Sequence, residues 1–289
     1  MTRPTQPQAG PRTGSPATPQ ARPPDGGLAF DVNLSILFTD LPLLERPAAA
    51  AKAGFDAIEL WWPFGGPDPS GAELAALRQA VEDAGVRLVG LNFDAGDMAA
   101  GERGLLARPD GSARFQANID AAVRLAGELG CTVLNALYGN GPGTDRDLAV
   151  VNLRRAADAA AGIGATVVVE ALNSHENPRY PITSSQAAFE LIEQVDRANV
   201  AFLADLYHLH RMGEDVLALI DRHADRFGHV QIADDPGRGA PGSGRMPYGE
   251  IFARLAAAGY RGHVGLEYRH EYRHEYRHEG PGAFDWRRA

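Results

Sequence analysis

Short apolar segments alternate with alanine-rich amphipathic segments along most of this chain, and this alternation restricts the fold more than any other feature. The amphipathic segments, such as GAELAALRQAVEDAG and ANIDAAVRLAGELG, often end in glycine just before the next apolar segment, as helices commonly do. The apolar segments are 30–38, 57–62, 86–93, 132–137, 166–172, 200–205, 227–234 and 262–268. Near-continuous apolar runs are typical of parallel strands that are buried on both faces.

Eight strand–helix units predict a closed (β/α)₈ barrel, or TIM barrel, in a single α/β domain that we place at residues 28–289. An open, doubly wound sheet shows the same alternation and is the competing architecture. It is disfavoured because no GxGxxG follows the first predicted strand and the sequence contains no phosphate-binding loop. Within the barrel we expect Asp40, Ser70 and Thr183 to cap helices.

The two ends of the chain differ from the middle. Residues 1–27 are rich in Pro, Gly, Thr and Gln and nearly lack large apolar side chains, which predicts a disordered N-terminal tail. Near the other end, EYRH occurs three times in succession from Glu267 to His278. We interpret this repeat, residues 268–279, as an expansion that forms a solvated, charged segment near the barrel rim.

Composition narrows the range of partners. The formal net charge is −9, which disfavours a nucleic-acid backbone as a ligand. No apolar run is long enough to cross a bilayer, so we expect no membrane partner. Cys131 is the single cysteine and excludes an intrachain disulfide, which is compatible with a cytoplasmic location. These features leave a homo-oligomer open.

Oxygen-bearing side chains stand near the C-terminal ends of four successive predicted strands. Glu170 follows TVVV, Asp205 follows VAFLA, Gln231 lies in HVQI and Glu267 follows HVGL. Barrel enzymes carry their catalytic residues at this end of the strands. A single acid there is best interpreted as a helix cap or a surface ion pair, but the set of four favours a site.

Carboxylates in one barrel mouth repel each other unless a cation lies among them. Hard oxygen donors suit Mg²⁺ or Mn²⁺ better than zinc. We therefore predict a divalent-metal site formed by Glu170, Asp205, Gln231 and Glu267. Gln231 is its weakest member, because Asp234 and Asp235 lie close enough in the sequence to compete.

A metal flanked by two glutamates indicates a reaction. A cation that binds the carbonyl and hydroxyl oxygens of an α-hydroxy-carbonyl compound acidifies the C–H between them. One glutamate then removes that proton and the other returns a proton to the neighbouring carbon, by way of an enediolate. With Glu170 and Glu267 as the pair, the sequence predicts isomerisation or epimerisation of a small hydroxy-oxo acid or sugar, without a nucleotide cofactor.

Other polar residues near the strand ends are candidates to contact the substrate. His208 can donate a hydrogen bond to a substrate oxygen, although an isolated histidine is more often a packed or surface residue. Glu176 is placed to hold His208 or a substrate hydroxyl. Arg238, on the Gly/Pro-rich loop DDPGRGAPGSG, suits a substrate carboxylate, with a solvated arginine as the alternative. Glu59, in AIELWW, is either a ligand or the partner of an arginine.

Motifs along the chain resemble those of the hydroxypyruvate isomerase family. In chain order they are NLSILF, FDAIELWWPF, NFDAGDMAAGERGLLARPDG, VEALNSHENPRYPI, DLYHLHRMGED, GHVQIADDPGRGAPGSG and GHVGLEY, and the resemblance covers Phe30 to Tyr268. It implies a metal-dependent TIM barrel, related to xylose isomerase and tagatose epimerase, that interconverts hydroxypyruvate and tartronate semialdehyde. Close relatives isomerise 2-oxotetronate.

The resemblance also assigns roles to residues. Glu170 and Glu267 match the proton-transfer positions, and the metal-ligand positions match Glu170, Asp205, Gln231 and Glu267. Glu176, His208 and Arg238 match substrate-contact positions of the wider superfamily. The chain departs from the family at Ala240 and Arg245, where glutamates are common, and after Glu267, where the EYRH repeat replaces a Pro/Gly-rich turn.

Alternatives remain from the same and from other classes. Another sugar or sugar-acid isomerase or epimerase is the nearest, and an Arg238 that points into the pocket would favour a short hydroxy-oxo acid over a neutral ketose. A metal-dependent hydrolase of the abasic-site endonuclease type needs several histidines at strand ends and a basic surface, which this acidic chain lacks. An inactive barrel or binding module is the non-enzymatic alternative.

Overall fold

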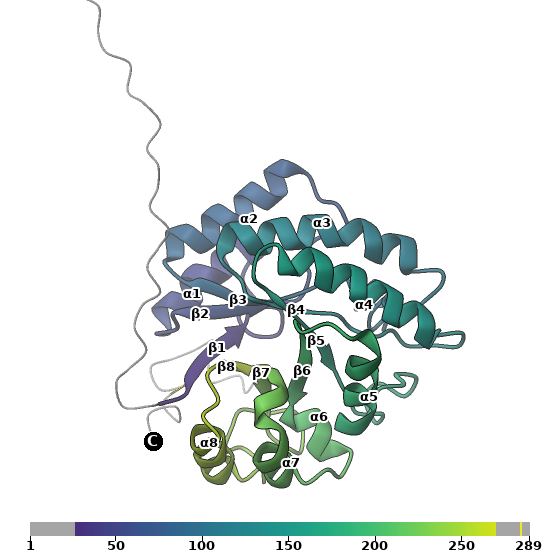
Figure 1. Ribbon diagram of the computed structural model, residues 1–289. Coiled ribbons are helices and arrows are strands. Elements are labelled where there is room, and N and C mark those ends of the chain that lie inside the picture. Colours follow the sequence, from purple (N-terminus) through teal and green to yellow (C-terminus); the bar gives the residue numbers. More distant parts are fainter. Residues whose placement is uncertain (1–26, 270–283, 285–289) are drawn as a thin grey trace, which may run out of the picture.

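A computed structural model describes residues 27–269 and Phe284 of the chain (Figure 1). Its eight parallel strands form one closed barrel in chain order, β1 to β8, which confirms the predicted TIM barrel. The strands are β1 (Ala29–Asn33), β2 (Ala57–Leu60), β3 (Arg87–Asn92), β4 (Val133–Asn135), β5 (Thr166–Glu170), β6 (Val200–Asp205), β7 (Phe227–Ile232) and β8 (His263–Leu266).

Helices surround this barrel and connect successive strands (Figure 1). They are α1 (Arg46–Lys52), α2 (Gly71–Ala84), α3 (Ser112–Leu129), α4 (Arg146–Ala161), α5 (Ser185–Val195), α6 (Leu206–Arg211), α7 (Val216–His223) and α8 (Tyr248–Ala257), with 3₁₀ turns at Leu43–Glu45 and Ala224–Arg226. None of the helices in the described part of the chain combines the length and apolarity that crossing a bilayer requires.

The first predicted strand is much longer than the observed one. Segment 30–38 is apolar throughout, yet β1 ends at Asn33. The Asn33 side chain accepts a hydrogen bond from the Ser35 amide at 2.9 Å, and its carbonyl accepts one from the Leu37 amide at 2.9 Å, so the chain turns here. Leu37 is nevertheless buried, which is why hydrophobicity alone did not locate the strand end.

One predicted helix cap is confirmed and two are wrong. Ser70 caps α2 through a capping box, accepting from the Glu73 amide while the Glu73 carboxylate accepts from the Ser70 amide at 2.9 Å. Helix α5 is capped by Ser184, which accepts from the Ala187 amide at 3.2 Å, and not by Thr183. Asp40 caps no helix, because a 3₁₀ turn precedes α1 and begins after Pro42.

The strand register sets the level of the predicted site residues. Asp205 at the end of β6 is opposite Gln231 in β7, and Gln231 is opposite Gly265 in β8. Neighbouring residues in register project to the same side of a sheet, so Asp205 and Gln231 lie side by side. Gly265 has no side chain, and a Cβ there would lie 2.9 Å from the Glu59 carboxylate, so the glycine leaves room for that acid.

The chain ends are described only in part. Nearly all of the predicted tail, residues 1–27, and most of the EYRH segment, residues 268–279, lie outside the described residues. Phe284 is described and buried, with its ring stacked 6.3 Å from Phe38 and edge-on to Phe55 at 4.8 Å.

Candidate active site

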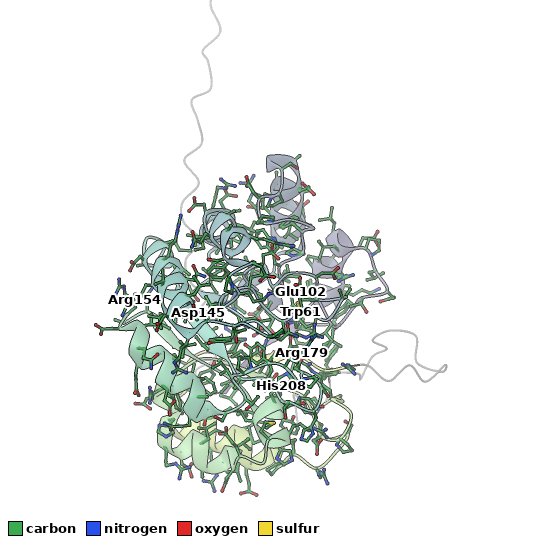
Figure 2. All side chains as sticks on the ribbon, turned by 90° about the vertical axis from the view of Figure 1, so that its right-hand side faces the viewer. Trp61, Glu102, Asp145, Arg154, Arg179 and His208 are labelled. Atoms are coloured by element: carbon green, nitrogen blue, oxygen red, sulfur yellow. The ribbon has the colours of Figure 1, made fainter. Side chains whose placement is uncertain are left out.

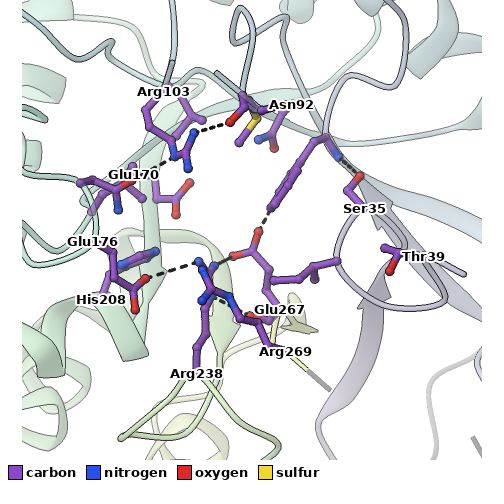
Figure 3. Close-up of a pocket in the computed structure, with 17 residues that line it drawn as sticks. Ser35, Thr39, Asn92, Arg103, Glu170, Glu176, His208, Arg238, Glu267 and Arg269 are labelled. Atoms are coloured by element: carbon purple, nitrogen blue, oxygen red, sulfur yellow. Dashed lines mark hydrogen bonds and ion pairs between the residues drawn. The ribbon is translucent and has the colours of Figure 1, made fainter. Parts of the chain in front are cut away.

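A cavity of about 480 Å³ opens at the C-terminal ends of the strands (Figure 3). Five of the seven predicted site residues line it, namely Glu170, Glu176, His208, Arg238 and Glu267. Asp205 and Gln231 are not on its wall but are buried. Figure 2 shows His208 near the centre of the molecule, whereas Arg154 on α4 lies at its periphery.

The two predicted proton-transfer residues come from β5 and from the residue after β8. Glu170 Oε2 accepts a hydrogen bond from Asn135 Nδ2 in β4 at 2.8 Å. Glu267 Oε1 accepts one from the indole nitrogen of Trp61 at 2.7 Å, and Oε2 accepts one from Arg238 Nη2 at 2.6 Å. Each carboxylate is therefore held in place by donors from other strands or strand ends of the barrel.

Asp205 lies between these two glutamates. Its Oδ1 accepts from the His208 amide at 3.0 Å, which caps α6, and Arg238 Nη2 is 3.8 Å from its Oδ2. Candidate ligand atoms of Glu170, Asp205 and His208 all lie within 4.8 Å of one another. The structure thus brings the three predicted carboxylates together, with Arg238 between Asp205 and Glu267.

Burial makes the ionised forms of these acids costly. Burial, followed by the charges of Glu267 and Asp205, raises the pKa of Glu170 well above its usual value. Burial raises the pKa of Asp205 to about 7, although Arg238 acts against it. Burial also raises the pKa of Glu267, with Arg238 opposing and Glu59 adding to the rise. A proton or a metal cation would offset this accumulation of negative charge.

Gln231, the fourth predicted metal ligand, carries an amide oxygen in addition to the three carboxylates. Its Nε2 donates to Glu59 Oε1 at 2.7 Å, while its Oε1 is buried and has no hydrogen-bond partner among the described residues. A carboxylate can only accept, so the amide nitrogen must face Glu59 and the oxygen must be turned away from it. A buried amide oxygen without a donor, beside Asp205, fits a cation ligand.

His208 is buried and placed as a neutral donor. Burial, and then the charges of Arg238 and Arg103, lowers its pKa well below the usual value. Its Nδ1 accepts from the Asn173 backbone amide at 3.1 Å, so the proton of the neutral ring is on Nε2. That Nε2 lies 3.6 Å from Asp205 Oδ2, at the edge of the cavity.

Glu176 has a different partner from the expected one. Its Oε1 accepts from the Tyr207 hydroxyl at 2.6 Å, and its Oε2 is 4.0 Å from Arg238 Nη1. The hydrogen bonds of His208 go elsewhere, so the suggestion that Glu176 holds His208 is wrong. The Glu176 side chain is 27% exposed and remains available to a ligand in the cavity.

The two aspartates that could have competed with Gln231 shape a loop instead. Asp234 accepts backbone hydrogen bonds from Gly242, Gly244 and Met246, each at 2.9 Å. Asp235 accepts from Arg211 at 2.9 Å and from Arg245 at 2.7 Å. They hold the β7–α8 loop, which carries Arg238, and leave Gln231 as the residue beside Asp205.

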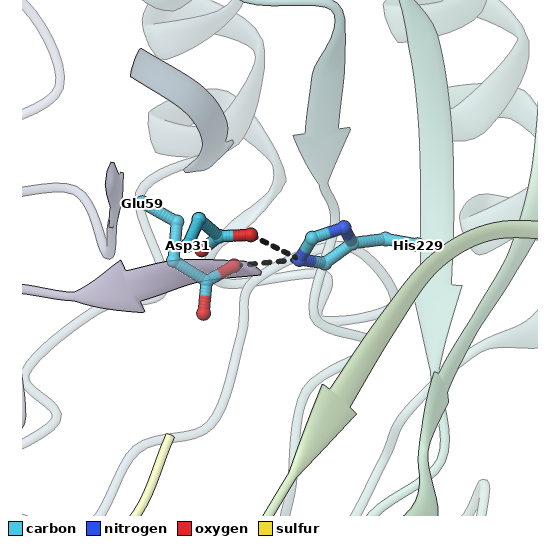
Figure 4. A group of neighbouring side chains, drawn as sticks. All are labelled: Asp31, Glu59 and His229. Atoms are coloured by element: carbon cyan, nitrogen blue, oxygen red, sulfur yellow. Dashed lines mark hydrogen bonds and ion pairs between the residues drawn. The ribbon is translucent and has the colours of Figure 1, made fainter. Parts of the chain in front are cut away.

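A second buried polar group lies inside the barrel, formed by Asp31, Glu59 and His229 (Figure 4). His229 Nε2 lies 2.7 Å from Glu59 Oε2 and 3.9 Å from Asp31 Oδ2. Burial lowers the pKa of His229, but its hydrogen bond to Glu59 and nearby acids outweigh burial and raise it overall. Glu59 therefore contacts His229 and Gln231, not an arginine as one interpretation of the sequence had it.

Four further residues of the site were not found by sequence analysis, namely Asn33, Asn135, His229 and Arg103. Asn33 donates hydrogen bonds to Glu59 at 3.1 Å and to Glu267 at 3.3 Å. A signal did exist for the strand residues: polar side chains recur at alternate positions of apolar strands, as in FDVN and HVQ. In an α/β barrel that alternation indicates a polar interior.

Comparison with known proteins assigns the architecture to a family. The family model described as the xylose isomerase-like TIM barrel matches residues 47–288. This chain belongs to that family. It is also 56% identical, over 83% of its length and 90% of the relative's, to a Streptomyces coelicolor protein named "Putative hydroxypyruvate isomerase".

Two further similarities refine this placement. A 2-oxo-tetronate isomerase of Pectobacterium atrosepticum is 36% identical, covering 83% of this chain and 91% of that one. A solved structure from Brucella melitensis, described as an AP endonuclease of family 2, has a TM-score of 0.77 and 38% identity, covering 83% of this chain and 93% of that one. The Streptomyces and Pectobacterium relatives place the chain in the hydroxypyruvate isomerase family and in the isomerase class of enzymes, whereas the Brucella structure supports the shared fold.

Proposed function

We propose that this chain is a metal-dependent isomerase that interconverts hydroxypyruvate and tartronate semialdehyde. The observation that carries the proposal is the placement of Glu170 and Glu267 on one cavity. Asp205 is buried, and so is a Gln231 oxygen that has no hydrogen-bond partner among the described residues. Two separate carboxylates are what a proton transfer between adjacent carbons requires. The relatives named above support this reaction class.

We assign the metal site to four oxygen donors: Glu170, Asp205, Gln231 and Glu267. Their chemistry fits Mg²⁺ or Mn²⁺. When bound, such a cation polarises the substrate carbonyl and hydroxyl oxygens and makes the intervening C–H more acidic. The raised pKa values of the three carboxyl groups indicate that the protein holds them in an environment that favours a compensating positive charge.

The protein's own residues then move protons. In hydroxypyruvate, one glutamate of the pair Glu170 and Glu267 removes a proton from C3, and the other delivers a proton to C2. The hydroxyl proton passes from the C3 oxygen to the C2 oxygen, so atoms and charges balance and no redox cofactor is needed. The enediolate between the two steps is stabilised by donors that already point into the cavity.

Substrate contacts are assigned to Glu176, His208 and Arg238, all of which line the cavity. His208 carries its proton on Nε2 and is suited to donate to an oxygen of the reacting carbons. Arg238 already bonds to Glu267, so we place its guanidinium at the reacting end of the substrate. Glu176 is the remaining hydrogen-bond acceptor for a substrate hydroxyl.

Isomerisation of 2-oxotetronate, which also carries a carboxylate, is the second candidate. The 36% identity to a 2-oxo-tetronate isomerase supports it. DNA hydrolysis, suggested by the description of the Brucella structure, receives less support from the site. Each candidate metal group among the described residues contains one histidine, and the rest are acids. The chain as a whole is acidic, which opposes binding to phosphates.

Nuclear magnetic resonance in deuterated buffer tests the proposal. The full chain is mixed with hydroxypyruvate, with and without Mg²⁺ or Mn²⁺. We expect metal-dependent deuterium incorporation and conversion to tartronate semialdehyde. No reaction with hydroxypyruvate would refute the assignment. If the chain converted 2-oxotetronate but not hydroxypyruvate, 2-oxotetronate isomerisation would be the assigned reaction.

A further inference from the structure

Arg103 lies on the loop between β3 and α3, in a motif that the proposed proton transfer does not use. This motif, GDMAAGERG at residues 96–104, contributes Met98, Ala99 and Arg103 to the wall of the cavity. We propose that Arg103 binds the carboxylate of the substrate and so selects hydroxy-oxo acids over neutral sugars. This inference rests on the proposed function, because it names the group that orients the substrate in the same cavity.

The backbone around Arg103 is fixed before any ligand arrives. The Arg103 amide donates to Asn140 Oδ1 at 2.9 Å, and its carbonyl accepts from the Gly139 amide at 3.0 Å. Gly104 adopts φ +104°, and a Cβ there would lie 2.1 Å from the Leu137 carbonyl oxygen. Only glycine permits this approach, which joins the loop to the segment after β4. Arg103 therefore belongs to a preorganised part of the rim.

The guanidinium is held by neutral acceptors. Nε donates to Asn177 Oδ1 at 2.9 Å, and Nη1 donates to the carbonyls of Met98 at 2.9 Å and Glu102 at 2.7 Å. Nη2 has no hydrogen-bond partner, and no carboxylate forms an ion pair with Arg103, within the described part of the chain. Figure 3 shows Arg103 among the residues that line the cavity. Two N–H donors and a full charge remain for a ligand.

Arg238 provides the contrast. Its guanidinium bonds to Glu267 at 2.6 Å and lies 3.8 Å from Asp205 and 4.0 Å from Glu176. The charge of Arg238 is thus already balanced by the protein, and these acids raise its pKa even though burial opposes the rise. A substrate carboxylate placed against Arg238 would approach the same acids and be repelled by them.

Two neighbouring arginines repel the charge of Arg103. Burial, and then the charges of Arg238 and Arg269, lowers the pKa of Arg103, while the charge of Glu176 acts against this decrease. An anion at Nη2 would relieve that repulsion and replace water around a partly buried cation. Arg103 lines the same cavity as Glu170 and Glu267, so a carboxylate bound at Arg103 keeps the adjacent carbons of the substrate in the cavity that holds both glutamates. The expectation that Arg238 binds the carboxylate is accordingly revised in favour of Arg103.

A direct binding measurement tests the role of Arg103 independently of catalysis. The full chain is titrated by calorimetry with glycerate, which keeps the carboxylate and the C3 hydroxyl of hydroxypyruvate but has a hydroxyl in place of the reactive C2 carbonyl. We expect Arg103→Gln to weaken glycerate binding about 10- to 100-fold. The matched control is Arg108→Gln, because Arg108 is on the same connection, bonds to Glu102 and Asp110, and lies outside the cavity wall. Glycerate binding that is equal in both variants, or undetectable in the wild type, would overturn the inference.

Kinetics give the second readout. Dihydroxyacetone is hydroxypyruvate with the carboxylate replaced by CH₂OH, so the two substrates differ only at the group assigned to Arg103. We expect Arg103→Gln to raise KM for hydroxypyruvate by the same 10- to 100-fold, with a smaller change in kcat and none in the rate with dihydroxyacetone. An equal loss with both substrates would overturn the inference. Absence of isomerase activity in a wild type that binds glycerate through Arg103 would refute only the proposed function.

Discussion

Gln231 donates its side-chain amide to Glu59 Oε1 at 2.7 Å, and this contact fixes the amide nitrogen on Glu59, so that the Gln231 oxygen is left for the metal site that we propose. We expect Glu59→Gln to weaken Mn²⁺ binding about 10- to 100-fold, as loss of a residue that orients a ligand commonly does. A glutamine at 59 can present either an oxygen or an amine, so Gln231 would no longer be held in one orientation. Titration of the metal-free chain with Mn²⁺ measures the effect.

The matched control for this variant is Glu214→Gln. Glu214 is also an acid with fixed hydrogen bonds, to the amide and hydroxyl of Ser185 at 2.7 and 2.6 Å, but it does not line the cavity. Its variant should bind Mn²⁺ as the wild type does. Unchanged affinity in Glu59→Gln would show that Gln231 is oriented without Glu59 or is not a ligand.

The proton-transfer pair should be indispensable. Replacing either Glu170 or Glu267 by glutamine removes a carboxylate that can exchange a proton with carbon, and we expect deuterium incorporation into hydroxypyruvate to fall by about 10²- to 10⁴-fold. The surface variant Glu250→Gln on α8 serves as the control. If both site variants retained the wild-type exchange rate, the acid–base assignment would be wrong.

Trp61 and Trp62 form a natural comparison. The indole of Trp61 donates to Glu267 at 2.7 Å and acts to lower the pKa of that acid, whereas the indole of Trp62 donates to the Gly66 carbonyl at 2.8 Å. Trp61→Phe keeps an aromatic ring but removes the donor, so we expect kcat to fall about tenfold. Trp62→Phe should leave kcat close to the wild-type value. Equal effects of the two substitutions would mean that the rings act only by packing.

The stability of the β7–α8 loop, which carries Arg238, should depend on pH through Asp235. Burial acts to raise the pKa of Asp235, but hydrogen bonds from Arg211 and Arg245 prevail and lower it. A lowered pKa in the folded state means that this acid stabilises the fold fully above the pKa it has when unfolded. The stabilisation is lost as pH falls through the lower, folded value.

Asp235→Asn should therefore reduce the free energy of unfolding by about 1–3 kcal/mol at pH 7. The difference from the wild type should shrink as pH approaches 3. Urea unfolding at both pH values measures it. A deficit that is the same at pH 3 and pH 7 would indicate that the carboxylate charge is not what stabilises the loop.

The barrel and the set of acids at its mouth could be predicted because both depend on local pattern. Apolar runs that alternate with amphipathic helices specify parallel strands and connecting helices, and the C-terminal ends of those strands meet at one edge in any such barrel. That geometry suffices to place Glu170, Asp205 and Glu267 together. The boundaries were less predictable, since Leu37 is buried beyond the end of β1 and looks like a strand residue.

The contacts between side chains of the site could not be predicted from the hydrophobic pattern of the sequence. Glu59 and Gln231 are 172 residues apart, and Arg238 and Glu267 belong to different strand ends, so their pairing depends on side-chain directions that periodicity does not encode. The sequence by itself determined the barrel and which end of it carries the acids. Only the tertiary structure decided that Arg238 forms ion pairs with acids while Arg103, among the residues that the structure describes, forms none, because ion pairs depend on distances between residues brought together by the closed barrel.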